Sequence, residues 1–149
     1  MEKPKFIYVT HINTTPEKLW EALTKPEFTQ QYWGGHRIQS DWTMGASVKF
    51  LKADGSIDLK GEVLRADPPK VLSYTWNGRS CAGTTEEGVT RVTFEISTAY
   101  NVTKLVVTHE GFEPGSKLLL EVTNGWQAVL SSLKTLLETG KALPFNWKG

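Results

Sequence analysis

Cysteine is nearly absent from this sequence, since Cys81 is the single cysteine among 149 residues. One cysteine excludes a disulfide within the chain and any metal or redox site built from paired cysteines. The chain also lacks the roughly 20 consecutive apolar residues of a membrane-spanning helix. No amino-terminal stretch has the apolar run of a secretory signal peptide. We therefore expect a cytoplasmic protein that does not insert into a membrane.

An excess of charge of one sign is missing as well. The chain carries 17 Lys and Arg against 16 Asp and Glu, a formal net charge of +1. This balance gives no electrostatic reason to expect a nucleic-acid partner. The three histidines, His11, His36 and His109, lack the spacing of metal-binding motifs, and no glycine-rich phosphate-binding loop is present. We expect no nucleic acid, no metal and no cofactor.

Aromatic side chains, in contrast, are abundant. The chain has six Trp, six Phe and four Tyr, and 39% of its residues are hydrophobic. This composition is typical of a folded chain and not of a disordered one. The length is that of one domain, and no linker or repeat divides it. We expect a single domain over residues 1–149.

The amino-terminal part predicts a strand followed by two short helices. Residues 5–12 are rich in β-branched and aromatic side chains that alternate between two faces. Thr15 can cap a helix and Pro16 suits its first position, so a helix is predicted to begin there. Pro26 ends that helix and opens a second one, which Gly34 and Gly35 end.

The rest of the chain predicts one-sided strands and then a long helix. Between residues 36 and 109, apolar side chains repeatedly alternate with polar ones, which is typical of an antiparallel sheet with one buried face. Residues 118–139 have apolar side chains three and four apart, so they predict a helix about 33 Å long. This helix is the candidate cover for the apolar face of the sheet.

A series of short segments then runs in order along nearly the whole chain: residues 15–24, Pro26-Glu27, Tyr32-Trp33, 61–64, 67–69, 74–76, 108–112, Gly125-Trp126 and 133–138. Together they resemble the START-like (SRPBCC) superfamily, in its branch of heat-shock-protein-90 ATPase activator homologues. The resemblance implies an α+β helix-grip fold. In that fold a curved antiparallel sheet of six or seven strands wraps around a long C-terminal helix, with two short helices after the first strand. It also implies an apolar cavity between sheet and helix.

No residue is predicted to be catalytic. His109 faces inward on its strand, but a general base needs a positioned partner and a substrate, and neither can be seen in the sequence. A hydrogen-bonded interior histidine is far more common. Cys81 and Ser131-Ser132 do not occur in the GxSxG pattern of an activated nucleophile.

The excess of aromatic residues at inward positions has two interpretations. Plain core packing accounts for most of them. Alternatively, several line a cavity, because buried Tyr and Trp need hydrogen-bond partners and a ligand site is an apolar wall with a few polar groups. The predicted cavity residues are Trp33, Phe50, Tyr74, Trp76, Phe94, Val107, His109, Trp126 and Val129.

Three functions remain open, in this order. The first is binding of a small hydrophobic or aromatic ligand such as a lipid, a polyketide or a flavonoid-like molecule. The second, implied by the resemblance, is a protein-interaction module of the chaperone-ATPase-activator type with a role in stress response. There a chaperone or homodimer contact would use exposed surface such as residues 118–120 or Val106. The third is a cyclase-like or hydrolase-like enzyme, for which no acid–base pair is visible.

The middle of the long helix carries the sharpest local prediction. We expect Trp126 to face the sheet near Trp76 and His109, with its ring in the cavity wall. Gly125 beside it costs about 1 kcal/mol of helix propensity relative to Ala. We interpret this cost as a sign that another backbone or a ligand approaches closely at Gly125.

Overall fold

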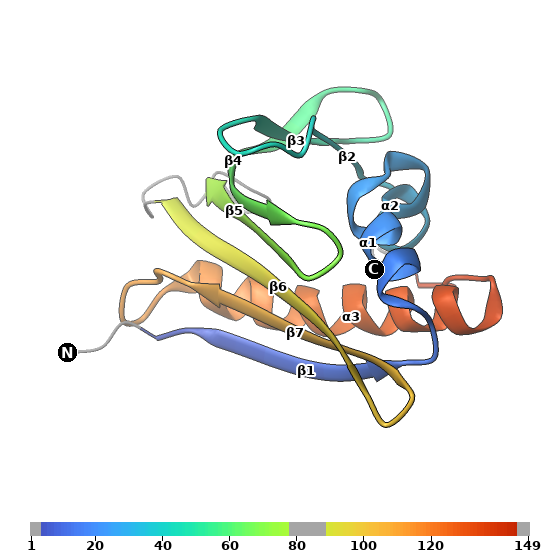
Figure 1. Ribbon diagram of the computed structural model, residues 1–149. Helices are drawn as coiled ribbons and strands as arrows, with labels where there is room; N and C mark the ends of the chain where they lie inside the picture. Colours follow the sequence, from blue (N-terminus) through green and yellow to red (C-terminus); the bar gives the residue numbers. More distant parts are fainter. Residues whose placement is uncertain (1–3, 78–88, 146–149) are drawn as a thin grey trace.

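The computed structural model describes residues 4–77 and 89–145, which form one sheet and three helices (Figure 1). Cys81 lies outside the described residues. The strands are β1 (Phe6–Ile12), β2 (Arg37–Gln39), β3 (Ser47–Leu51), β4 (Ile57–Asp67), β5 (Val71–Asn77), β6 (Val89–Ala99) and β7 (Val102–Glu110). The helices are α1 (Pro16–Thr24), α2 (Pro26–Tyr32) and α3 (Lys117–Thr139).

The sheet has seven strands in the order β1-β7-β6-β5-β4-β3-β2, and every neighbouring pair is antiparallel. The first strand therefore pairs with the last one, and the remaining strands follow each other in reverse chain order. Helix α3 runs along one face of this curved sheet, and α1 and α2 lie near the carboxyl-terminal end of α3 (Figure 1). The predicted α+β helix-grip fold is confirmed, with seven strands and two short helices after the first strand.

The helix boundaries follow from local capping residues, among them the predicted Thr15 and Pro16. Thr15 Oγ1 accepts a hydrogen bond from the Lys18 backbone N–H at 3.2 Å, and Pro16 is the first residue of α1. At α3 the hydroxyl of Ser116 accepts from the Leu119 backbone N–H at 3.0 Å. Gly140 ends that helix with a φ of 86°, a conformation that glycine adopts without steric cost.

The core lies between α3 and the inner face of the sheet. On β7 the inward residues are buried while their neighbours are partly exposed, so the predicted alternation holds. The buried stripe of α3 consists of Leu118, Val122, Trp126, Val129, Leu130, Ser132, Leu133 and Leu136. The stripe starts at Leu118, whereas Leu119 is only half-buried on its flank. Each large apolar side chain in this layer contributes roughly 1.5–3 kcal/mol to stability.

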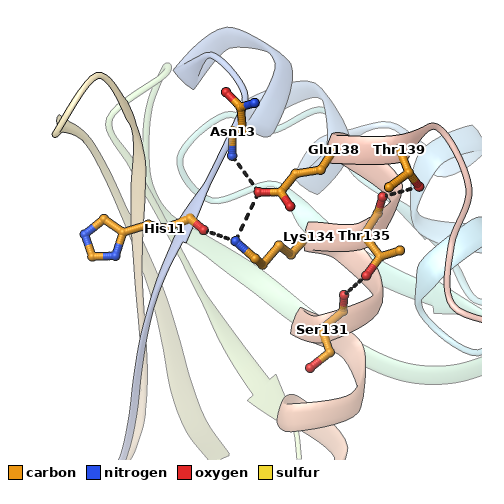
Figure 2. A network of polar contacts seen from close by, with 7 residues as sticks. All are labelled: His11, Asn13, Ser131, Lys134, Thr135, Glu138 and Thr139. Carbon is orange, nitrogen blue, oxygen red and sulfur yellow. Dashed lines mark hydrogen bonds and ion pairs between the residues drawn. The ribbon is translucent and has the colours of Figure 1, made fainter.

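Two side chains of α3 fix the helix to the end of β1 (Figure 2). Lys134 Nζ donates to the backbone carbonyl of His11 and lies 3.0 Å from Glu138 Oε2. The same carboxylate accepts from the Asn13 backbone N–H at 2.8 Å. The Asn13 N–H and, second, Lys134 lower the pKa of Glu138. This junction sets where α3 crosses the sheet.

Gly61 allows β4 to approach β5 closely. A Cβ atom at this position would lie 2.0 Å from the carbonyl oxygen of Thr75, which no real side chain tolerates. The neighbouring Glu62 backbone N–H donates to Thr75 Oγ1 at 2.8 Å, and the β4–β5 register shifts between Val63 and Arg65. This close β4–β5 contact positions the segment of β5 whose side chains Tyr74 and Trp76 lie on the inner face of the sheet.

Within residues 4–77 and 89–145, no helix combines the length and the apolar character that crossing a bilayer would require.

Candidate functional site

All nine predicted cavity residues are buried between the inner face of the sheet and α3. They come from six separate parts of the chain. Trp33 follows α2, Phe50 lies on β3, Tyr74 and Trp76 on β5, Phe94 on β6, Val107 and His109 on β7, and Trp126 and Val129 on α3. The structure thus brings all nine into one core, and the seven with rings are here called the aromatic cluster.

Trp126 lies at the centre of the aromatic cluster. Its ring centroid is 5.2 Å from that of Trp33, 5.8 Å from Trp76, 5.9 Å from Phe94 and 6.1 Å from His109. Most of these pairs are edge-to-face, the arrangement that the ring quadrupoles favour by about 0.5–1.5 kcal/mol beyond area burial. The prediction that Trp126 faces the sheet beside Trp76 and His109 is confirmed.

A chain of three hydrogen bonds passes through His109. Trp126 Nε1–H donates to His109 Nδ1 at 3.1 Å, so the imidazole proton is assigned to Nε2. That nitrogen then donates to Thr90 Oγ1 at 2.8 Å, and the Thr90 hydroxyl donates to the backbone carbonyl of Trp76 at 3.2 Å. Burial lowers the pKa of His109 to about 3, because charge is disfavoured away from water. This histidine is therefore neutral, and both its ring nitrogens are used.

Trp76 differs from its neighbours in having a donor that no protein group accepts. Its side chain is 8% exposed, and its Nε1 is the only buried side-chain nitrogen or oxygen of the described residues without a hydrogen-bond partner. The ring lies 5.1 Å from Phe50 and 5.1 Å from His109, measured between centroids. An unsatisfied buried N–H costs roughly 1–3 kcal/mol, and such a group in a native protein calls for an explanation.

Residues 13–138 match the family model described as Activator of Hsp90 ATPase homolog 1-like protein. The chain belongs to this family. The match covers most of the sequence and contains the whole aromatic cluster. The family resemblance drawn from the sequence is confirmed.

Three solved structures are similar to this Activator of Hsp90 ATPase homolog 1-like protein. Protein MLL2253 from Mesorhizobium loti is 28% identical with a TM-score of 0.75, and the match covers 90% of this chain and 96% of that one. The Aha1 dimer from Colwellia psychrerythraea is 22% identical, with a TM-score of 0.76 and coverage of 93% and 99%. DynU16, a protein in the dynemicin biosynthetic locus, is 22% identical with a TM-score of 0.73, and 93% of this chain matches 48% of DynU16. No curated protein sequence matches the chain.

In this family member one of the two reasons inferred for Gly125, the close approach of another backbone, is wrong. A Cβ atom at Gly125 would have nothing within 4 Å, so neither the sheet nor another backbone approaches it. The glycine lies beside Trp126 on the flank of the stripe and not on its buried side. The suggestion that residues 118–120 form an exposed surface also needs correction, since Leu118 is fully buried and only Leu120 is strongly exposed.

Two residues of the site were missed at the sequence level. Phe112 is buried with its centroid 4.6 Å from that of His109, the shortest ring distance around the histidine. Thr90 accepts from the His109 Nε2–H, the tautomer that the Trp126 contact assigns. The inward alternation of β6 extends back from Phe94 through Val92 to Thr90, and this pattern could have identified the threonine.

The turn that carries Trp33 is held by a second histidine. His36 Nδ1 lies 3.0 Å from the Trp33 carbonyl oxygen, and His36 Nε2 lies 2.9 Å from Asp58 Oδ2. The contacts join the end of α2 to β4. Among the described residues no group of three or more His, Cys, Asp and Glu side chains could hold a metal ion. We therefore interpret the His36–Asp58 pair as a contact that stabilises the turn after α2.

A hollow of about 790 Å³ lies on the outer face of the sheet. Its lining includes Leu64, Thr75, Arg91 and Glu110, and the last two form an ion pair at 3.1 Å. Thr75 alternates with the buried Tyr74 and Trp76, so its side chain points away from α3. None of the nine predicted cavity residues lines this hollow.

Proposed function

We propose that the protein binds a small hydrophobic or aromatic molecule between the sheet and α3. The observation that carries the proposal is the aromatic cluster itself, in which buried rings surround a few polar groups on Trp76 and His109. That composition is typical of a small-molecule site. A core that serves only stability avoids buried side chains with polar N–H or O–H groups. A similar structure, DynU16, comes from the dynemicin biosynthetic locus, which supports a polyketide-like ligand as one candidate.

Binding requires the rings to move apart, since their centroids are already at contact distance. Trp33 is best placed to move, because it follows α2 in a turn and belongs to neither a helix nor a strand. It is 9% exposed and Trp76 is 8% exposed, the highest values in the aromatic cluster. The ligand therefore reaches the interior beside Trp33 and Trp76, and Trp33 swings outward to admit it.

Two-dimensional NMR of ¹⁵N-labelled protein with a library of apolar and aromatic molecules tests this function. Binding in the aromatic cluster shifts the indole N–H signals of Trp33, Trp76 and Trp126 together. The signal of Trp20, which lies on α1 and packs against the core without a ring contact to the aromatic cluster among the described residues, serves as the internal reference. Ligands that shift only residues of the outer face, or no ligand at all, would contradict the proposal.

A second candidate function is a protein contact, and one observation favours it. On the edge strand β1, Ile7 is 53% exposed and Val9 is 51% exposed, and Val9 pairs with Val106 of β7. An edge strand with apolar side chains is a template for pairing with another chain. A structural neighbour, Aha1 from Colwellia psychrerythraea, is a dimer.

Light scattering after size-exclusion chromatography tests this candidate. If β1 is the contact, Val9→Lys converts a wild-type dimer into a monomer. Ile57→Lys is the matched control, since Ile57 is a similarly exposed apolar residue on a different strand. A wild-type protein that is monomeric at all concentrations argues against a homodimer through β1.

A further inference from the structure

The indole groups of the described tryptophans show what is unusual about Trp76. Trp42 Nε1–H donates to the Thr24 carbonyl at 2.8 Å, and Trp126 Nε1–H donates to His109. Trp76 Nε1 is buried and has no acceptor among the described residues. Buried tryptophans normally find a partner for this group.

The rings in contact with Trp76 do not supply that acceptor. Phe50 offers no hydrogen-bonding atom, and the rings of Trp33 and Trp126 carry only donors. His109 is the single ring in contact with Trp76 that has an acceptor nitrogen, and Trp126 already occupies it. The other nitrogen of His109 is a donor toward Thr90.

The backbone fixes Trp76 on the inner face of the sheet. β5 lies between β4 and β6, and Trp76 pairs in register with Thr90. The Trp76 carbonyl also accepts from the Thr90 hydroxyl. The indole N–H is therefore buried on the side of the sheet that carries the aromatic cluster, and no group of the described residues accepts from it.

From this orphan donor we infer that the ligand is a neutral, largely aromatic molecule with one hydrogen-bond acceptor, such as a ketone, quinone or ester carbonyl, which accepts from Trp76 Nε1–H. The inference rests on the proposed function and adds the polarity and orientation of the ligand. The acceptor is neutral because none of the four rings that contact Trp76 carries a charge, since His109 resists protonation at this depth. A carboxylate there would be a buried charge without a counter-ion, which is strongly disfavoured.

Three probes of nearly equal shape test the inference: 1-tetralone, tetralin and 1,2,3,4-tetrahydro-1-naphthoate. Tetralone differs from tetralin by the carbonyl, and the naphthoate offers a charged acceptor. We expect tetralone to bind about tenfold more tightly than tetralin, since it satisfies a buried donor that tetralin leaves unpaired. The naphthoate binds more weakly than either. In the NMR titration the Trp76 indole proton moves downfield with tetralone only.

The variant Trp76→Phe keeps an aromatic ring and removes the N–H. It should bind tetralone and tetralin with equal affinity, whereas Trp20→Phe, the control, retains the tenfold preference. A melting curve checks that both variants are folded. If Trp76→Phe does not fold, the downfield shift of Trp76 in the wild-type protein remains the deciding measurement.

The outcomes separate this inference from the proposed function. Equal affinity for tetralone and tetralin, with shifts throughout the aromatic cluster, contradicts the inferred hydrogen bond from Trp76 to a ligand acceptor. The same result still supports ligand binding in the cluster. A persistent water contact at the Trp76 N–H in the tetralone complex also contradicts that hydrogen bond, because the donor is then satisfied by solvent. Absence of any cluster shift with all three probes contradicts the proposed function, and the inference falls with it.

Discussion

Trp126 on α3 and His109 on β7 are joined by a 3.1 Å hydrogen bond in which the indole N–H donates to the imidazole Nδ1. This bond connects the middle of the long helix to the end of β7, the strand next to the edge strand β1. Because the acceptor must be an unprotonated nitrogen, the attachment of α3 depends on a neutral imidazole. The charge state of one buried side chain is thus coupled to the packing of helix on sheet.

This coupling predicts a pH dependence of stability. The pKa of His109 is about 3 in the folded protein and about 6.5 in the unfolded chain, so only the unfolded chain takes up a proton between these values. Stability is therefore fully present above pH 6.5 and declines as the pH falls toward 3. The free energy of unfolding should drop by about 1 kcal/mol per pH unit between pH 6 and pH 5.

Urea unfolding at pH 7, 6 and 5 measures this slope. The matched variant is His109→Phe, which keeps a ring but cannot take up a proton. At pH 7 it should be less stable by about 1–3 kcal/mol, since the Trp126 N–H loses its acceptor. Its loss of stability between pH 6 and pH 5 should be smaller than that of the wild type by about 1 kcal/mol. Equal slopes in the two proteins would show that His109 is not held neutral.

Removing the Trp126 side chain tests how the centre of the aromatic cluster is packed. Its ring is 3% exposed and contacts four other rings, so Trp126→Ala should destabilise the protein by roughly 3–5 kcal/mol. Leu120→Ala, at a site 69% exposed on the same helix, should change stability by less than about 0.5 kcal/mol.

The outcome bears on the choice between packed core and ligand site. A loss well below 3 kcal/mol would mean that part of the ring borders open space in solution, because fewer contacts are lost. A loss at the top of the range would mean that the rings close fully on one another without ligand. Addition of indole to Trp126→Ala should restore part of the stability, because a ligand that fills the new cavity binds only the folded protein.

Much of the fold was predictable because its signals are local. The caps Thr15 and Gly140, the prolines that open α1 and α2, and the period-two alternation on β7 each act within a few residues. The inward placement of Tyr74, Trp76 and Phe94 followed from the same alternation. Such signals also placed all nine cavity candidates in one core, since a one-sided sheet and one apolar helix stripe must face each other.

The polar part of the site could not be predicted in this way. Whether the Trp76 N–H has a partner depends on the side chains of β7 and α3, which are far from it in sequence. The absence of a neighbouring backbone at Gly125 could not be foreseen for a related reason, since a helical wheel shows which side of the helix a residue is on but not what lies opposite it. Gly61, in contrast, sits against the backbone of Thr75, and only the β4–β5 register reveals that contact.

The junction of α3 with β1 predicts a second effect of acid. The pKa of Glu138 is lowered by the Asn13 N–H and by Lys134, so its contribution is present above the pKa of the unfolded chain, about 4.5, and is lost as the pH falls below it. Glu138→Gln should reduce stability by about 1 kcal/mol at pH 7 and by less at pH 3.5. Glu121→Gln, at an exposed position on the same helix, is the control. An equal cost of Glu138→Gln at both pH values would count against the charged junction.

The glycines Gly61 and Gly125 should respond in opposite ways to the same substitution. At Gly61 a methyl group would lie 2.0 Å from the Thr75 carbonyl oxygen, so Gly61→Ala must push β4 away from β5, at a cost of roughly 1–3 kcal/mol or more. At Gly125 the methyl group meets open space inside a helix, so Gly125→Ala should stabilise the protein by about 0.5–1 kcal/mol. Thermal unfolding of the two variants measures both changes. A loss of stability in Gly125→Ala would contradict the open space that the structure shows around this position.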